Sequence, residues 1–370
     1  MATAGLVFCY RAAVADFARR LAELLTPWFA ANQRDLEWRR TRDPYAIWVS
    51  EIMLQQTRVD TVRAYYRRFM ERFPDVGTLA AADEEAVLAA WSGLGYYRRA
   101  RLLHAGARHV ASALGGSLPR TGEGLRSIPG VGRYTAGAIA SIAFDEPVPL
   151  VDGNVARVLS RLGAIEDVKG QGADAPGHWK VVAEVLGAGS PRVLAQALME
   201  LGATVCTPQS PRCSLCPAQE LCQGRARGLQ ETIPAAKKKA PSEEHALWAL
   251  AIVDGGAGRG ALAERVLLER RPAGGLLGGL WCLPLLPRQG EKAGPAEVKA
   301  GTGVAVRTVE APQATVRHVF SHRIWNLYPC VARARGPGEA GDGRVWIGRG
   351  ERPMGGIPRV TEKLLAAIGF

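Results

Sequence analysis

Four cysteines near the middle of the chain have the spacing of metal ligands. Cys206, Cys213, Cys216 and Cys222 are separated by six, two and five residues, so their thiolates can converge on one centre. Four thiolates suit either a [4Fe–4S] cluster or a tetrahedral zinc ion. Zinc usually takes two short pairs separated by a longer loop, which this run does not have. We therefore expect a metal centre bound by all four cysteines.

A glutamate in the first part of the chain is placed to act as a general acid. Asp43 and Pro44 predict the start of a helix, and in that helix Glu51 shares its face with Ile47 and Trp48. A purely structural glutamate would normally lie on the solvated face, because a buried carboxylate without partners is costly. Burial should raise the pKa of Glu51, which suits proton donation near neutral pH.

A second carboxylate, Asp152, is expected to begin another helix. Its simplest role is that of an N-cap. The N-terminus of a helix also favours negative charge, so we expect this carboxylate to stay ionised. An ionised carboxylate stabilises a sugar that becomes positive as its glycosidic bond breaks, while Glu51 would protonate the departing base. The two carboxylates together predict cleavage of a glycosidic bond.

A glycine-containing turn, Gly130-Val131-Gly132 after Pro129, connects two short helical segments. Glycines let the backbone approach a phosphate, and the free N–H groups at a helix start favour an anion. Such a hairpin would bind a DNA backbone without reading bases. Because similar turns occur in proteins that bind nothing, this signal gains weight only from its place before the cysteines.

The composition is that of a globular protein with a polyanionic partner. The 370 residues are 47% hydrophobic and carry a formal net charge of +12, which favours nucleic acid. Seven cysteines, four of them close together, favour a reducing compartment. Because no apolar stretch approaches the roughly eighteen residues of a membrane helix, we expect no membrane association.

The elements that must position these residues change in type along the chain. Up to about residue 205 apolar residues recur at helical spacing. Beyond residue 245 short strand-like runs at 247–253, 265–268 and 324–331 alternate with glycine-rich turns, and a helical tail covers 361–368. The sequence therefore predicts two domains, mainly α and then α+β.

Four further stretches give the chain a family resemblance. Read with the cysteines, they resemble the adenine DNA glycosylases of the MutY type, within the endonuclease III or helix-hairpin-helix superfamily. These stretches are WVSEIMLQQT (48–57), GLGYY (93–97), IPGVGRYT (128–135) and VDGNV (151–155). The resemblance implies a helix-hairpin-helix glycosylase domain at 10–223 with a [4Fe–4S] cluster, a linker at 224–244, and a Nudix-like domain at 245–370.

The resemblance also assigns roles to residues. It implies that Glu51 is the general acid and that Asp152, helped by Tyr134 and Asn154, stabilises the cation that water then attacks. It implies that the adenine is flipped out of the duplex. The residues expected to enter or contact the DNA are Gln56, Thr57, Tyr96, Gly130, Val131 and Gly132.

One position predicts that the strand is not cut. Superfamily members that also nick the strand carry a lysine where this chain has Tyr134, because a Schiff base needs an amine. No lysine occurs between Met1 and Val168. We therefore expect a monofunctional enzyme that leaves an abasic site, without Schiff-base lyase activity.

The C-terminal part resembles the family's 8-oxoguanine recognition domain. Phe320, Ser321 and His322 match the loop that contacts the oxidised base. Between Gly278 and Val304 the acidic residues are Glu291 and Glu297, so the acidic helix of Nudix hydrolases is missing. A nucleotide-pyrophosphate hydrolase is therefore disfavoured.

Partners and location follow from the resemblance. The sequences of the stretches 132–144 and 199–208 resemble those of animal members more than those of bacterial members. This predicts location in the nucleus and also in the mitochondrion. We expect a monomer that binds duplex DNA with adenine opposite 8-oxoguanine or guanine, and whose linker can bind replication or checkpoint clamp proteins. A catalytically silent DNA-binding iron–sulfur protein is the main alternative, and the presence of both Glu51 and Asp152 argues against it.

Overall fold

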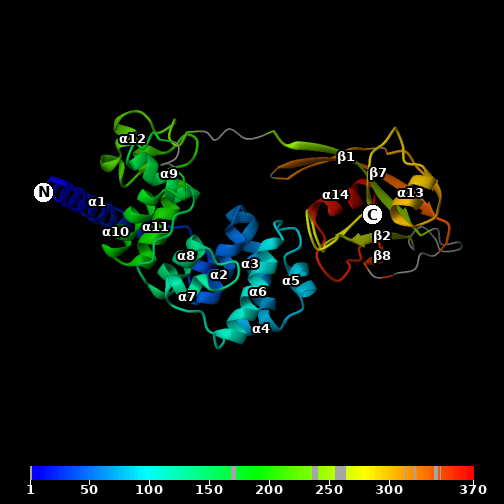
Figure 1. Ribbon diagram of the computed structural model, residues 1–370, viewed down its shortest axis with the longest axis horizontal. Coiled ribbons are helices and arrows are strands. Elements are labelled where there is room, and N and C mark those ends of the chain that lie inside the picture. Colours follow the sequence, from blue (N-terminus) through cyan, green and yellow to red (C-terminus); the bar gives the residue numbers. More distant parts are fainter. Residues whose placement is uncertain are drawn as a thin grey trace. The chain divides into compact units, whose positions relative to one another are not determined.

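The computed structural model describes most of the chain as two compact units (Figure 1). One unit is Met1–Ala81 with Leu102–Lys237, and the other is Ala82–Arg101 with Lys238–Phe370. The described residues are 2–167, 172–235, 241–254, 264–312, 314–320, 322–336, 341 and 343–370, with side chains from residue 13 onward. Within these residues no helix is long and apolar enough to span a membrane. The domain limits predicted from the sequence stay a prediction. The division into units shows in addition that residues 82–101 pack with the C-terminal part of the chain.

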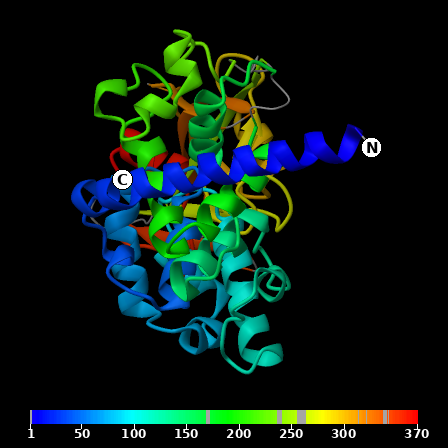
Figure 2. The ribbon, with the colours of Figure 1, turned by 90° about the vertical axis from the view of Figure 1, so that its left-hand side faces the viewer.

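The first unit is built from helices. Its longest, α1 (Ala2–Asn32), lies across the others in Figure 2 and buries Leu21, Leu25 and Phe29, spaced one helical turn apart, against α10 and α11. The other helices are η1 (Glu37–Arg39), α2 (Pro44–Leu54), α3 (Val59–Arg72), α4 (Val76–Ala81), α6 (Arg98–Ala113, which begins in the second unit), α7 (Gly122–Arg126), α8 (Arg133–Phe144), α9 (Gly153–Leu162), α10 (Pro176–Gly187) and α11 (Pro191–Thr204). The mainly helical first domain is confirmed.

Both carboxylate-bearing helices begin as the sequence predicts. The side chain of Asp43 accepts hydrogen bonds from the backbone N–H groups of Tyr45 and Ala46, and Pro44 occupies the first turn of α2. Asp152 caps α9 by accepting from the N–H of Val155 at 2.7 Å. These caps fix where each helix starts and therefore which way its first turn faces.

The predicted hairpin connects α7 and α8. Ile128 and Val131 are buried, whereas Gly130 and Gly132 are exposed. Gly130 has φ +82°, and a Cβ there would lie 2.7 Å from the Cβ of Leu102, so both the conformation and the space require glycine.

The cysteine-containing segment follows α11 as a compact loop. It consists of η3 (Cys213–Leu215), η4 (Gln219–Leu221) and α12 (Gln223–Ala226). A Cβ at Gly224 would lie 2.5 Å from the carbonyl oxygen of Arg161, so glycine lets this loop pack directly on α9.

The second unit contains one mixed sheet in the order β3-β2-β1-β7-β5, with β4 paired to β1, β6 to β7 and β8 to β2. The pair β1–β7 is parallel and the other pairs are antiparallel. The strands are β1 (Glu243–Val253), β2 (Arg265–Arg270), β3 (Trp281–Cys282), β4 (Leu285–Pro287), β5 (Val306–Val309), β6 (Val316–Val319), β7 (Arg323–Ala334) and β8 (Arg344–Gly348). The three predicted strands are confirmed within longer ones.

Both faces of this sheet are buried. Along β1, Trp248 and Leu250 belong to one apolar core, and Ala249 and Ala251 belong to the other. Two helices complete these cores, α13 (Pro295–Thr302) beside Trp248 and α14 (Arg359–Ala367) beside Ala249. The predicted α+β character and helical tail are confirmed.

The segment Ala82–Arg101, with α5 (Glu84–Ala90), belongs to the same unit as the sheet. The hydroxyl groups of Ser92 and Tyr97 both donate to the carbonyl oxygen of Ile357, at 2.7 and 2.8 Å. The predicted GLGYY stretch is therefore tied to the loop before α14.

Candidate active site

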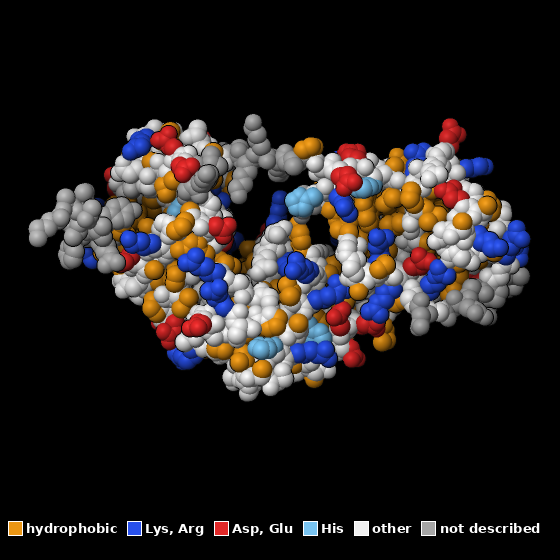
Figure 3. All heavy atoms as spheres, viewed as in Figure 1, with side chains coloured by type: hydrophobic (Ala, Val, Ile, Leu, Met, Phe, Trp, Pro, Cys, Tyr) orange, Lys and Arg blue, Asp and Glu red, His pale blue; other side chains and the backbone are white. Residues whose placement is uncertain are grey.

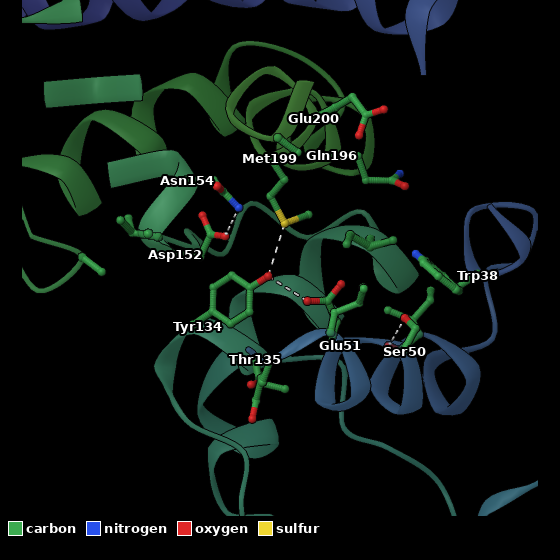
Figure 4. A pocket seen from close by; sticks show the side chains of 18 of the residues that line it. Trp38, Ser50, Glu51, Tyr134, Thr135, Asp152, Asn154, Gln196, Met199 and Glu200 are labelled. Carbon is green, nitrogen blue, oxygen red and sulfur yellow. Dashed lines mark hydrogen bonds between the residues drawn. The ribbon is translucent and has the colours of Figure 1, made fainter. Parts of the chain in front are cut away.

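A cavity of about 1060 Å³ opens among the helices of the first unit. It is large enough for a nucleobase and a sugar. The predicted catalytic residues Glu51, Tyr134, Asp152 and Asn154 all line it, together with the predicted DNA contacts Gln56, Thr57, Gly130 and Gly132. Figure 4 shows the hydroxyl of Tyr134 pointing toward the Glu51 carboxyl group, with Asp152 and Asn154 on the neighbouring wall.

Glu51 is buried in the cavity wall, as its apolar neighbours predicted. The residue is 5% exposed. Burial raises its pKa to about 7, with a further upward contribution from the charge of Asp152; the hydrogen bond from Tyr134 and the charge of Arg39 act in the opposite direction. A carboxyl group with this pKa holds a proton for a substantial part of the time at neutral pH, which a general acid requires.

Tyr134 at the start of α8 bonds to Glu51. Its hydroxyl oxygen lies 2.8 Å from Oε2 of Glu51 and 3.3 Å from Sδ of Met199. Burial, followed by the charges of Glu51 and Asp152, raises the pKa of Tyr134 well above its usual value. The phenol therefore stays neutral and acts as a hydrogen-bonding group.

Asp152 combines the cap with a place in the cavity, and there burial opposes the expected effect of the helix N-terminus on its pKa. Oδ1 accepts from the N–H of Val155, and Oδ2 accepts from Nδ2 of Asn154 at 3.0 Å. Burial raises the pKa of Asp152 more than these hydrogen bonds and the charge of Arg157 lower it. Desolvation thus outweighs the helix terminus.

Arg157 connects Asn154, the hydrogen-bond donor to Asp152, to the cysteine loop, and the sequence alone did not single it out. Its guanidinium donates to Oδ1 of Asn154 and to the carbonyl oxygens of Gly202 and Cys206, each at 2.8 Å. A Cβ at Gly202 would lie 2.7 Å from that of Asn154. Asn154 is therefore fixed from behind by Arg157 and Gly202 while it donates to Asp152.

A second buried glutamate, also missed, lines the same cavity. Glu200 is fully buried and accepts hydrogen bonds from Arg34 and Arg39, with contacts of 2.7 Å to each guanidinium. Burial alone would raise its pKa, but these two arginines together lower it to about 2. A sequence signal existed, because α11 places polar or sulfur-containing side chains at helical spacing toward the cavity. These cavity residues are Gln196, Met199 and Glu200.

The four predicted metal ligands lie around a smaller cavity. Cys206, Cys213, Cys216 and Cys222 all line it, next to Arg161 of α9. Nη1 of Arg161 lies 3.4 Å from Sγ of Cys206, and the backbone N–H of Arg225 donates to Sγ of Cys222 at 3.4 Å. Among the described residues no three His, Cys, Asp or Glu side chains are grouped closely enough to hold a single metal ion. Four sulfur atoms around one space, two of them next to N–H donors, fit a cluster ligated by thiolates.

The predicted DNA contacts of the first unit present exposed backbone. Gly130 and Gly132 are exposed, and Gly132 begins α8 without a side-chain cap, whereas the Val131 side chain is buried. Thr57 is half-buried; Gln56 is exposed and has φ 56°, a left-handed conformation that is rare and strained for this residue type.

The second unit holds the remaining predicted contacts. Tyr96 is 48% exposed and left-handed with φ 50°. Arg99 beside it is buried, with its guanidinium 5.3 Å from the Tyr96 ring, whereas Arg98 is exposed. Backbone strain of this kind clusters at functional sites.

The predicted 8-oxoguanine loop follows β6. Phe320 is half-buried, and its ring lies 4.5 Å from that of His318 and 4.9 Å from that of Trp325. His322 is exposed. Ser321 lies outside the described residues. Lys and Arg side chains are distributed over both units on the face shown in Figure 3.

Comparisons with known proteins agree with this site. Residues 49–174 match the family of HhH-GPD superfamily base excision DNA repair proteins, and residues 260–367 match the NUDIX domain. A solved structure of a thermostable thymine-DNA glycosylase is 26% identical with a TM-score of 0.53, covering 57% of this chain and 98% of that one.

Two mammalian relatives match over most of the chain. The adenine DNA glycosylase of Homo sapiens is 39% identical over 354 residues, and that of Rattus norvegicus is 40% identical over 368 residues. These matches cover 80% and 84% of this chain, and the chain spans 64% and 69% of the two relatives. The expected likeness to animal members is confirmed. With its helix-hairpin-helix fold, its paired carboxylates and these relatives, the chain belongs to the adenine DNA glycosylase family.

Proposed function

We propose that this chain removes adenine from duplex DNA where the adenine is paired with 8-oxoguanine or guanine, and leaves the strand uncut. The observation that carries this proposal is the convergence of Glu51, Tyr134 and Asp152 on one cavity. The family relationship supports adenine as the excised base, and the Nudix-like domain supports a role in reading the opposite base.

The arrangement of the cavity suggests how the bond is broken. Glu51, with its pKa near 7, donates a proton to the adenine, which leaves poorly as an anion. The carboxylate of Asp152, oriented by Asn154, stabilises the positive sugar that remains. Water then attacks the sugar. Because Tyr134 offers a hydroxyl where a Schiff base would need an amine, no covalent lyase step follows.

We further propose that Cys206, Cys213, Cys216 and Cys222 hold a [4Fe–4S] cluster. When bound, the cluster would cross-link the four thiolates and so order the loop after α11. Arg161 helps to fix the position of Cys206, since it also donates to the carbonyl oxygen of the next residue, Thr207, at 2.6 Å. Analysis of the purified chain should find four irons and four acid-labile sulfides, and zinc in their place would contradict the proposal.

A location and a protein partner are also proposed. We propose action in the nucleus, with the mitochondrion as a second location, and binding of clamp proteins by the linker 224–244. Described linker residues such as Arg227 and Glu231 are exposed, which supports binding; residues 236–240 lie outside the described part. The predicted monomer stays a prediction.

The test of the proposed activity is direct release of the base. A labelled duplex with adenine opposite 8-oxoguanine should yield free adenine, and one with adenine opposite thymine should yield far less. Glu51→Gln should lower release by roughly a hundredfold or more, as expected for loss of a general acid. Equal release from both duplexes would contradict the proposed specificity.

A further inference from the structure

The hydroxyl of Tyr134 lies between two acceptors. Its oxygen is 2.8 Å from Oε2 of Glu51 and 3.3 Å from Sδ of Met199, and Figure 4 shows it between the two side chains. A phenol has a single hydrogen to donate but can also accept. Only one of the two contacts can therefore be a donation from Tyr134 at any moment.

The protonation state of Glu51 decides whether the Tyr134 hydroxyl donates to Glu51 or to Met199. An ionised carboxylate only accepts, so Tyr134 then donates to Glu51. A protonated Glu51 can donate to the oxygen of Tyr134, whose hydrogen then needs another acceptor. Sδ of Met199 lies within hydrogen-bond distance for sulfur and lines the same cavity.

We propose that Met199 is a positioning residue for proton donation, an inference that rests on the proposed function. Its thioether accepts the Tyr134 hydrogen while Glu51 carries the catalytic proton. Once that proton has left for the base, the Tyr134 hydrogen turns to the Glu51 carboxylate. No bond other than hydrogen bonds changes at Met199. The charged groups that act on Glu51 are Asp152 at the start of α9 and Arg39 of η1.

Replacing the sulfur tests this role, because leucine has nearly the volume of methionine but no acceptor. The Glu51 carboxyl band, identified by its loss in Glu51→Gln, is titrated by infrared difference spectroscopy, and single-turnover adenine release is measured over the same pH range. Met199→Leu should lower the midpoint of both curves by about half a pH unit, because the protonated form loses a hydrogen bond. Met199→Gln, whose amide oxygen accepts, should restore it.

A second background separates the hydrogen bond from packing. In Tyr134→Phe the substitution Met199→Leu should leave the infrared midpoint unchanged, since no hydroxyl remains to be accepted. An unmoved midpoint in the parent background, or an equal shift in the Tyr134→Phe background, would overturn the role of Met199. Thermal unfolding checks that each variant is folded. Absence of adenine release from the parent protein would instead refute the proposed function, whatever the infrared titration shows.

Discussion

Two regions of one cavity wall shift the pKa of a buried glutamate in opposite directions. On α2, Glu51 is 5% exposed, it accepts a hydrogen bond from the neutral Tyr134, and its pKa rises to about 7. On α11, Glu200 is fully buried, yet bonds from Arg34 and Arg39 lower its pKa to about 2. Burial therefore creates a proton donor only where no cation forms an ion pair with the carboxylate. Glu51 is suited to chemistry and Glu200 to holding helices together.

The largest effect should come from breaking the compensated pair. Glu200→Gln leaves Arg39, whose side chain is 10% exposed, without its carboxylate, and should lower the free energy of unfolding by about 3 kcal/mol. Chemical denaturation measures the change. Glu23→Gln, which removes the exposed pair with Arg19, is the control and should change stability very little. Equal effects would show that the buried pair contributes no more than a surface one.

Removing the buried charge of Glu51, which has no ion-pair partner like those of Glu200, should stabilise the protein. Between pH 4.5 and 7 folded Glu51 keeps a proton that the unfolded chain has lost, so the stability of the parent falls as the pH rises through this window. Glu51→Gln lacks this penalty and should gain about 2–3 kcal/mol relative to the parent between pH 5 and pH 8. Thermal unfolding of both proteins across this range measures it. A difference that does not change with pH would mean that the pKa of Glu51 is not raised.

Disconnecting Asp152 from the cysteine loop should have an intermediate effect. Arg157→Leu leaves the acceptors on Asn154, Gly202 and Cys206 without their donor and should destabilise the fold by about 1–2 kcal/mol. We also expect slower adenine release, because Asn154 no longer holds Asp152. Arg227→Leu is the control, since the Arg227 side chain is 57% exposed. Unchanged release in Arg157→Leu would show that this connection does not position Asp152.

The smallest effect is the pH dependence of the parent enzyme. Because the active form of Glu51 is protonated, the single-turnover rate should fall about tenfold for each pH unit above 7. Asp152 acts ionised, so a second decline should occur as the pH falls through its raised pKa. A rate that rises above pH 7 would exclude Glu51 as the proton donor.

The features that the sequence predicted are local ones. The caps of α2 and α9, the burial of Glu51 and the cysteine loop follow from spacing within a few residues. Arg34 and Glu200 are separated by 166 positions, so their pairing depends on how helices pack. The contact of Met199 with Tyr134, the hydrogen bond of Arg157 to Cys206 and the parallel pairing of β1 with β7 also join residues far apart in the sequence, so sequence spacing did not predict them. The raised pKa of Asp152 was not predicted, because the burial that raises it exists only once the helices have assembled around the cavity.

The central claim, a monofunctional glycosylase with Glu51 as its acid, is tested most directly by strand scission. A duplex with adenine opposite 8-oxoguanine is incubated with the parent protein or Glu51→Gln, and half of each sample is then treated with alkali. We predict scission only in the alkali-treated parent sample, because an abasic site forms without cutting the strand. Scission by the parent protein without alkali, or scission that persists in Glu51→Gln, would contradict this mechanism.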